Sequence, residues 1–342
     1  MRAQPLAIHG TGLMTAVGSD AVSCGAAFRV KVTNPTPTRF IDSAGDWIMA
    51  HQVGVAGQRP GLAKLACMAA TVIDEALAGV VSSDRPGIPL LLCVAERQRP
   101  GRLEGLDDRL FEEIRMLLSE RFSQHSAVVA QGRVGVAVAL ARARQLLQAG
   151  VADRILIAAV DSLLCWQTLM HYDRADRLLR QDNSNGFIPG EGAGAVLVGK
   201  PTGRTELLCT GLGFAHEAAH IDSERPLRAD GLAAAFRAAL REAGREIYDF
   251  DYRVADLSGE QYYFKEAALA LSRTMMQPKD EFDLWHPAEC TGEAGALAGT
   301  AIISLIDTAC RKSFTRGPRI VAHMANDAGA RAAVLMEQQG AR

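Results

Sequence analysis

The second half of the chain repeats the order of segments found in the first half. A helix rich in small residues, an apolar strand and a closing strand recur in that order at 135–150, 153–162 and 192–200, and then at 295–312, 318–327 and 329–338. Self-similarity of this kind predicts two similar halves that pack face to face. We place the boundary near residue 203, so that residues 1–203 form the first half and residues 204–342 the second.

Short apolar runs alternate with longer segments of helical period along the first half. The runs that predict buried strands are 90–95, 128–130, 154–160 and 195–198. The segments with apolar residues at helical spacing are 62–77, 106–118 and 134–147. Strand–helix alternation of this kind predicts an α/β layered fold with a largely parallel sheet.

Composition narrows the classes of function. The 342 residues carry a formal net charge of -2 and no basic cluster interleaved with aromatic residues, so nucleic acid is not an expected partner. The first ten residues lack the apolar core of a signal peptide, and no apolar run approaches the length of a membrane span. The seven cysteines are scattered without CxxC spacing, which favours a reducing cytoplasm.

The stretch NGFIPGEGAGAVLVGK, residues 185–200, raises the question of a phosphate-binding loop. A Walker-type loop needs Lys and Ser/Thr directly after its glycines and then a helix. Here the glycines run into the apolar strand AVLV instead, so neither that loop nor a dinucleotide fingerprint fits. The simpler interpretation is a tight turn in which glycines let the backbone pack closely against another element.

The sequence HEAAH, residues 216–220, matches the H-E-x-x-H pattern of zinc peptidases. That pattern binds zinc only on a helix, where both imidazoles lie on one face. Here it follows a strand-like run and precedes Pro226, and no third ligand is evident downstream. We therefore predict a loop with two surface or pocket-lining histidines, and no metal.

Several segments together resemble the β-ketoacyl synthases. GFIPGEGAGAVLV resembles the segment that closes the first half of the thiolase fold, and AIHGTGLMTAVG (7–18) resembles the opening strand and turn. GVADRILIAAVDS (150–162) resembles the strand after the nucleophile helix, and TGLGFAHEAAHIDSERP (210–226) resembles the loop that begins the second half. The resemblance implies a thiolase-like fold of two similar halves in layers ordered α-β-α-β-α.

The resemblance also implies a cysteine nucleophile at the start of the central helix of the first half, where the helix dipole lowers the thiol pKa. Two histidines from the second half should assist it. Counted without gaps, the nucleophile position falls on Arg133, the first histidine on Leu257 and the second on Glu289. All three identities are lost, so the expectation is a catalytically degenerate protein with no catalytic residue and no cofactor.

Three other residues are fallback candidates. Gln131 would reach the nucleophile position with a two-residue insertion, as in decarboxylating ketosynthase-like domains that carry glutamine there. His286 would replace the second histidine if its segment shifted by three. Cys290, beside Glu289, is a relocated nucleophile only if it is not one of the structural cysteines that apolar neighbours usually indicate.

The favoured function is therefore a non-catalytic ketosynthase-like scaffold or partner protein, related to an acyltransferase but no longer one. It would pair with itself or with a related ketosynthase-like chain, or serve as an adaptor linked to bacterial secretion effectors. The alternative is residual acyl-carrier-dependent β-ketoacyl synthase or malonyl decarboxylase activity, and zinc hydrolysis is a third, weaker reading. The sequence does not choose between a fatty acid, polyketide or secretion context.

Two structural expectations follow. The segment VVAQG (128–132) is β-branched and lacks the charges that protect a free sheet edge, so it is the expected dimer strand. Arg133 and Glu289 should form an ion pair, shared with Asp256, that plugs the former pocket, because a buried guanidinium cannot lose its proton. The alternative is that both side chains point into solvent, as surface charges usually do.

Overall fold

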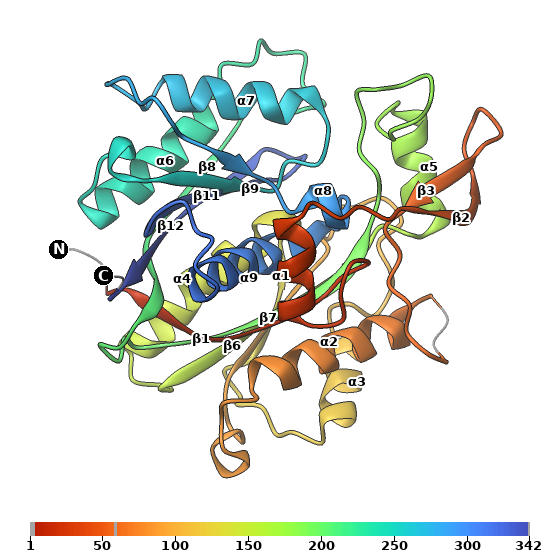
Figure 1. Ribbon diagram of the computed structural model, residues 1–342. Helices are drawn as coiled ribbons and strands as arrows, with labels where there is room; N and C mark the ends of the chain where they lie inside the picture. The colour runs from red at the N-terminus through yellow and green to blue at the C-terminus, as the bar shows by residue number, and fades with distance from the viewer. Residues whose placement is uncertain (1–3, 58–59, 341–342) are drawn as a thin grey trace.

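The computed structural model describes residues 4–57 and 60–340. A ten-stranded sheet forms the centre of the molecule (Figure 1), and its strands in spatial order are β10 (Leu284–Trp285), β9 (Tyr252–Ala255), β11 (Arg319–Ala325), β12 (Ala330–Gln339), β8 (Glu206–His216), β1 (Leu6–Met14), β7 (Glu191–Gly199), β6 (Arg154–Ser162), β4 (Leu90–Val94) and β5 (Ala127–Ala130). A separate hairpin pairs β2 (Thr36–Ile41) with β3 (Trp47–Ala50).

The sheet consists of two halves with the same strand order. The order β5-β4-β6-β7-β1 in the first half corresponds, position by position, to β10-β9-β11-β12-β8 in the second. Within each half, the two outer strands pair in parallel and the closing strand pairs antiparallel with its neighbours. The sheet is therefore mixed, and the expectation of a largely parallel sheet is wrong, because both closing strands and the junction of the halves pair antiparallel. A short antiparallel pairing of β1 with β8 joins the halves. The repeat read from the sequence is therefore a repeat of topology, while the division at residue 203 itself stays a prediction.

The helices lie in three layers around the two half-sheets (Figure 1). The helices are α1 (Ala21–Arg29), α2 (Leu62–Ala76), α3 (Arg109–Leu118), α4 (Gly135–Gln148), α5 (Trp166–Arg174), α6 (Asp230–Ala243), α7 (Gln261–Ser272), α8 (Ala288–Thr291) and α9 (Ala298–Arg311). Helices α4 and α9 contact both half-sheets and each other, α2 covers β1, β6 and β7, and α6 covers β8 and β12. This is the expected α-β-α-β-α arrangement.

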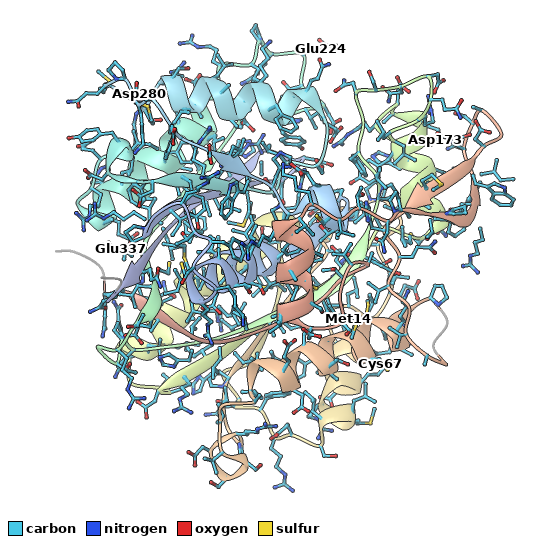
Figure 2. All side chains as sticks on the ribbon, in the orientation of Figure 1. Met14, Cys67, Asp173, Glu224, Asp280 and Glu337 are labelled. Atoms are coloured by element: carbon cyan, nitrogen blue, oxygen red, sulfur yellow. The ribbon has the colours of Figure 1, made fainter. Side chains whose placement is uncertain are left out.

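The predicted strands and helices of the first half are confirmed to within a few residues. The closing strand β7 is buried along its whole length, because α9 packs on one side of it and α2 on the other. The main apolar core surrounds α4 and α9, and two further cores lie under α2–α3 and under α6–α7. Figure 2 shows side chains filling the spaces between these layers.

Close backbone packing explains the glycine-rich stretch before and within β7. A Cβ on Gly190 would lie 2.1 Å from the carbonyl oxygen of Thr291, and one on Gly194 would lie 2.4 Å from the hydroxyl of Thr300 in α9. Neither neighbour can move away, since one is backbone and the other belongs to a buried helix. The glycines bring the chain close to the second half and form no phosphate-binding loop, as predicted.

Candidate functional site

Two short 3-10 turns meet at the centre of the molecule, and each leads into one of the two central helices. The turn Gly132–Val134 precedes α4, and the turn Gly295–Leu297 precedes α9. Both begin with a glycine at positive φ, 53° at Gly132 and 56° at Gly295, a conformation that other residues adopt only with strain. The two turns are in contact. The start of the central helix of one half therefore faces the start of the other.

Arg133 lies in the first of these turns and is 7% exposed. Its Nη1 donates to Oε2 of Glu293 at 3.2 Å, and its Nη2 donates to the hydroxyl of Tyr263 at 2.7 Å and to the carboxylate of Asp327. The guanidinium also lies 4.6 Å from the centroid of the Tyr263 ring. Because a buried guanidinium keeps its charge, these partners are what make its burial tolerable.

Asp327 binds a second buried arginine. Arg177 donates to both oxygens of Asp327, at 2.9 and 3.1 Å, and to both oxygens of Glu260, at 2.7 and 2.9 Å. Burial by itself would raise the pKa of Asp327, but Arg133 and Arg177 outweigh it and hold that pKa well below its usual range. Asp327 is therefore a carboxylate shared between two guanidinium groups.

A third arginine lies next to the other two. Arg99 donates from Nη1 to both oxygens of Asp161 at 2.8 Å, and from Nη2 to Glu96 at 2.7 Å. Asp161 in turn accepts the backbone N–H of Ala296 at 2.8 Å, inside the turn that precedes α9. The end of β6, where Asp161 lies, is thus tied to the start of the second central helix.

Asp256 and Glu293 complete the arrangement from the second half. Glu293 accepts hydrogen bonds from the Ser258 hydroxyl and from the backbone N–H of Gly295, both at 3.0 Å. Asp256 accepts the backbone N–H of Ala325 at 2.8 Å. Burial raises the pKa of Asp256 to about 7, against the opposing attraction of Arg133. The carboxyl of Asp256 therefore titrates well above the range of an ordinary aspartate.

We call this group the central charged cluster: Glu96, Arg99, Arg133, Asp161, Arg177, Asp256, Glu260, Glu293 and Asp327. The cavity that remains against Arg133 and Arg99 has a volume of about 10 Å³. A second cavity, beside Asp256 and Glu293, is equally small. Each is about the size needed for one water molecule. The space at the two helix starts is filled by side chains.

The central charged cluster contains no cysteine. Guanidinium and carboxylate groups dominate it, and its hydroxyls belong to Tyr172, Ser258 and Tyr263. The thiol of Cys93 lies against Gly135 at the start of α4, but it is fully buried, and burial strongly raises its pKa. A thiol that stays protonated is a poor nucleophile.

The expected ion pair between Arg133 and Glu289 is wrong, although the expected burial and pairing of Arg133 are confirmed. Glu289 lies in the first turn of the short helix α8 and faces outward, where it pairs with Lys31 at 3.2 Å and with His286 at 3.0 Å. The chain then turns at Gly292, whose φ is 66°, and the acid that enters the centre is Glu293. The partner thus lies four residues further along than predicted.

None of the remaining sequence candidates belongs to the cluster. Leu257 is 2% exposed and belongs to the core under α6 and α7. The side chain of Gln131 is exposed and lines a cavity of about 540 Å³ that Glu96, Arg99 and Asp327 border, while its backbone carbonyl accepts from Asn326 at 2.8 Å and its backbone N–H donates to Val129 at 3.1 Å. His286 lies with Glu289 on the outer side of α8. Cys290 is 2% exposed, and burial raises the pKa of its thiol to about 11, so almost none is thiolate at neutral pH.

The HEAAH segment is a strand end followed by a turn, as predicted. His216 is the last residue of β8, and residues 217–220 form no helix. The buried Glu217 accepts the backbone N–H of Gly231 in the first turn of α6 at 2.7 Å, so it serves as a helix cap. Within residues 4–57 and 60–340, no group of three His, Cys, Asp or Glu side chains is arranged to hold a metal ion. No helix in those ranges is long and apolar enough to span a membrane.

Sequence reasoning singled out Arg133 and Asp256 but missed Arg99, Arg177, Glu260, Glu293 and Asp327. The signal for Asp327 is the stretch MANDAGAR (324–331), in which an acid directly follows an apolar strand. Glu260 and Glu293 are carboxylates inside otherwise apolar or glycine-rich runs, a pattern that indicates buried pairing. The pairing itself joins segments more than 80 residues apart, so no local pattern encodes it.

Comparison with known proteins identifies the fold. A profile of the family described as "Beta-ketoacyl synthase, N-terminal domain" matches residues 134–201, from the start of α4 to the end of β7. The structure of the ishigamide ketosynthase/chain length factor superposes with a TM-score of 0.81 over 99% of this chain and 100% of that chain, at 16% identity. The fold is that of the ketosynthases. The thiolase-like resemblance read from the sequence is thereby confirmed.

Two further structures have the same ketosynthase fold. One is a type II polyketide acyl-carrier protein in complex with its ketosynthase, with a TM-score of 0.81, 14% identity, and coverage of 98% of this chain and 100% of that chain. The other is a ketosynthase in complex with its chain length factor from Xenorhabdus doucetiae, with a TM-score of 0.77, 12% identity, and 98% coverage of both chains. A comparison with curated protein sequences finds no match.

Proposed function

We propose that this chain is a non-catalytic ketosynthase-like scaffold that pairs with a related ketosynthase-like chain or with a second copy of itself. The observation that carries the proposal is the buried Arg133, which lies at the start of α4 and is held by Glu293 and Asp327. A guanidinium cannot be acylated, and the cluster around it leaves space for about one water molecule. The space directly against Arg133 therefore has no room for a thioester, and the ion pairs of Arg133 hold the two halves together.

The solved relatives support the pairing. Two of them are described as a ketosynthase with its chain length factor, which is an assembly of two chains. In this chain, β5 lies at one end of the ten-stranded sheet and pairs only with β4 within the described residues. Its residues carry no charge, and Ala127, Val128 and Ala130 are half-buried. An uncharged edge strand is a template for pairing with another chain, so we assign the interface to β5.

The adaptor role linked to bacterial secretion effectors is a finer form of the same proposal, and it differs only in the partner. Residual synthase or decarboxylase activity has no comparable support, because Leu257 and Glu289 stand where the two histidines are expected and the thiol of Cys290 is buried away from the cluster. The partner is named by affinity purification of the tagged chain from its native host, followed by mass spectrometry.

Sedimentation tests the pairing itself. We expect the purified 36.6 kDa chain to sediment as a dimer at micromolar concentration, or to co-purify in equal amount with a ketosynthase-like chain. Val128→Glu should weaken the assembly, because it places a carboxylate on the edge strand. Val30→Glu is the matched control, since Val30 is 70% exposed at the end of α1. A monomeric wild type with no partner recovered from cells would contradict the proposal.

A further inference from the structure

A different cavity lies on the outer side of α8, away from the central charged cluster. Its volume is about 350 Å³, within the range of small-molecule sites, which begins at roughly 300 Å³. Its walls come from the end of α1, from β10, from α8 and from the loop after α9. The two cavities directly against Arg133 and Asp256 have about 10 Å³ each, so this cavity can hold an organic molecule and those two cannot.

One wall of this cavity is a series of aromatic rings anchored in the core. Tyr252, which is fully buried, lies 4.5 Å from Trp285, and Trp285 stacks on Phe314 with centroids 6.3 Å apart and an interplanar angle of 27°. Phe28 and Leu305 add further apolar surface. Trp285 and Phe314 are both half-buried. A rigid aromatic surface of this kind favours a flat apolar body.

The rim of the cavity carries a surplus of positive charge. Lys31 and Glu289 pair at 3.2 Å, and Arg316 is paired with Asp283 at 3.1 Å. His286 contacts Glu289 at 3.0 Å, and burial lowers the pKa of this histidine, so it adds no charge at neutral pH. The charge of Arg29 is not balanced in this way. Among residues 4–57 and 60–340, no acid lies within ion-pair distance of it.

Arg29 is placed to bind an anion at the aromatic wall. It lies in the last turn of α1, is exposed, and its guanidinium lies 5.2 Å from the centroid of the Phe314 ring. The ring holds the guanidinium at the mouth of the cavity. Its planar fork of N–H donors matches a carboxylate, which it can bind with two parallel hydrogen bonds.

We infer that the cavity beside α8 is a binding site for a small organic carboxylate with an aromatic body. The carboxylate binds Arg29, and the aromatic body lies against Trp285 and Phe314. This site uses none of the residues of the central charged cluster, so it stands independently of the proposed scaffold function.

The test compares two probes of the same shape by isothermal titration calorimetry. 2-Naphthoate carries the carboxylate, and 2-naphthylmethanol has the same aromatic body without a charge. We expect the naphthoate to bind the wild-type chain at least tenfold more tightly than the alcohol. Arg29→Gln should weaken naphthoate binding by about ten- to hundredfold, the usual effect of losing charge-assisted hydrogen bonds, and leave alcohol binding unchanged.

Two controls keep the result specific. Arg225→Gln removes the same charge from an exposed residue outside the cavity and should leave both affinities unchanged. In a Trp47→Phe/Trp166→Phe background, Trp285 is the only tryptophan, and naphthoate should change its fluorescence. Equal binding of acid and alcohol, no binding of either at millimolar concentration, an equal effect of the two arginine variants, or an unchanged Trp285 signal would each overturn the inference.

Discussion

The two halves of this molecule have the same strand order but contribute opposite charges to its centre. The first half supplies the three arginines of the cluster, Arg99, Arg133 and Arg177, while the second supplies four acids, Asp256, Glu260, Glu293 and Asp327. Only Arg99 is paired within its own half, with Glu96 and Asp161. The two halves thus share one backbone arrangement but place opposite charges at the centre. The ion pairs between these charges hold the halves together.

The largest expected effect comes from removing Arg133. Arg133→Met keeps most of the side-chain volume but leaves Glu293 without its buried cation and Asp327 with only one. The loss should be about 4 kcal/mol in the free energy of unfolding, the usual consequence of leaving a buried charge uncompensated. Denaturant unfolding at pH 7.5 measures it. A loss below about 1 kcal/mol would show that the two halves do not depend on this contact.

Removing the charge of Glu293, which the second half places against Arg133, should lower the free energy of unfolding by somewhat less. Glu293→Gln keeps the shape, but its single amide oxygen can replace only one of the two carboxylate oxygens that accept from Ser258 and Gly295. The change also takes one negative charge from Arg133, which keeps Asp327. We expect a loss of roughly 3 kcal/mol. The double variant Arg133→Met/Glu293→Gln should lose less than the sum of the single losses, since each change removes the penalty that the other creates. Strict additivity would mean that the two side chains do not interact.

The third effect depends on pH. Asp256 has a folded pKa of about 7 against an unfolded value of 3.8, so the folded state retains a proton that the unfolded state has lost. Its favourable contribution is complete below about pH 4 and is lost as the pH rises to about 7. Asp256→Asn removes this dependence. We expect the variant to match the wild type near pH 4 and to be more stable by roughly 2 kcal/mol at pH 6, about two pH units above the unfolded pKa. Parallel stability–pH curves for the two proteins would contradict the buried neutral carboxyl.

The smallest effect is expected at Glu289, on the outer side of α8. Its side chain is 31% exposed and its partner Lys31 is 73% exposed, so solvent screens the pair. Glu289→Ala should change the free energy of unfolding by at most about 0.5 kcal/mol. Comparison with Glu293→Gln by the same unfolding method separates the surface acid from the central one. If Glu289→Ala lowered the free energy of unfolding as much as Glu293→Gln does, the assignment of Glu293 as the central acid would be contradicted.

The fold was predictable because the repeat and the alternation of apolar runs are local patterns that recur. The strands at 90–94, 154–162 and 191–199 follow from β-branched and leucine-rich runs that are buried on both faces. The close packing of β7 follows from its glycines. The burial of Arg133 was also predictable, since a charged residue at the start of a central helix must find partners there.

The identity of those partners was not predictable from spacing. Glu289 and Glu293 are both acids ahead of α9, and only the turn at Gly292 decides which one faces inward. Arg177 and Asp327 come from loops on opposite sides of the molecule's centre, 150 residues apart. Such contacts depend on how the two halves dock, and no periodicity in either half encodes the docking.

Acyl transfer tests the proposal most directly. The chain is incubated with an activated acyl thioester beside a ketosynthase that has its active cysteine, and the intact mass of both proteins is measured. We expect the ketosynthase to gain the acyl mass and this chain to remain unchanged, because Arg133 lies at the position that we assign to the nucleophile and the cysteines Cys93 and Cys290 are buried thiols with raised pKa values. A stoichiometric acyl adduct that peptide mapping places on Cys290, or on any residue of the central charged cluster, would contradict it.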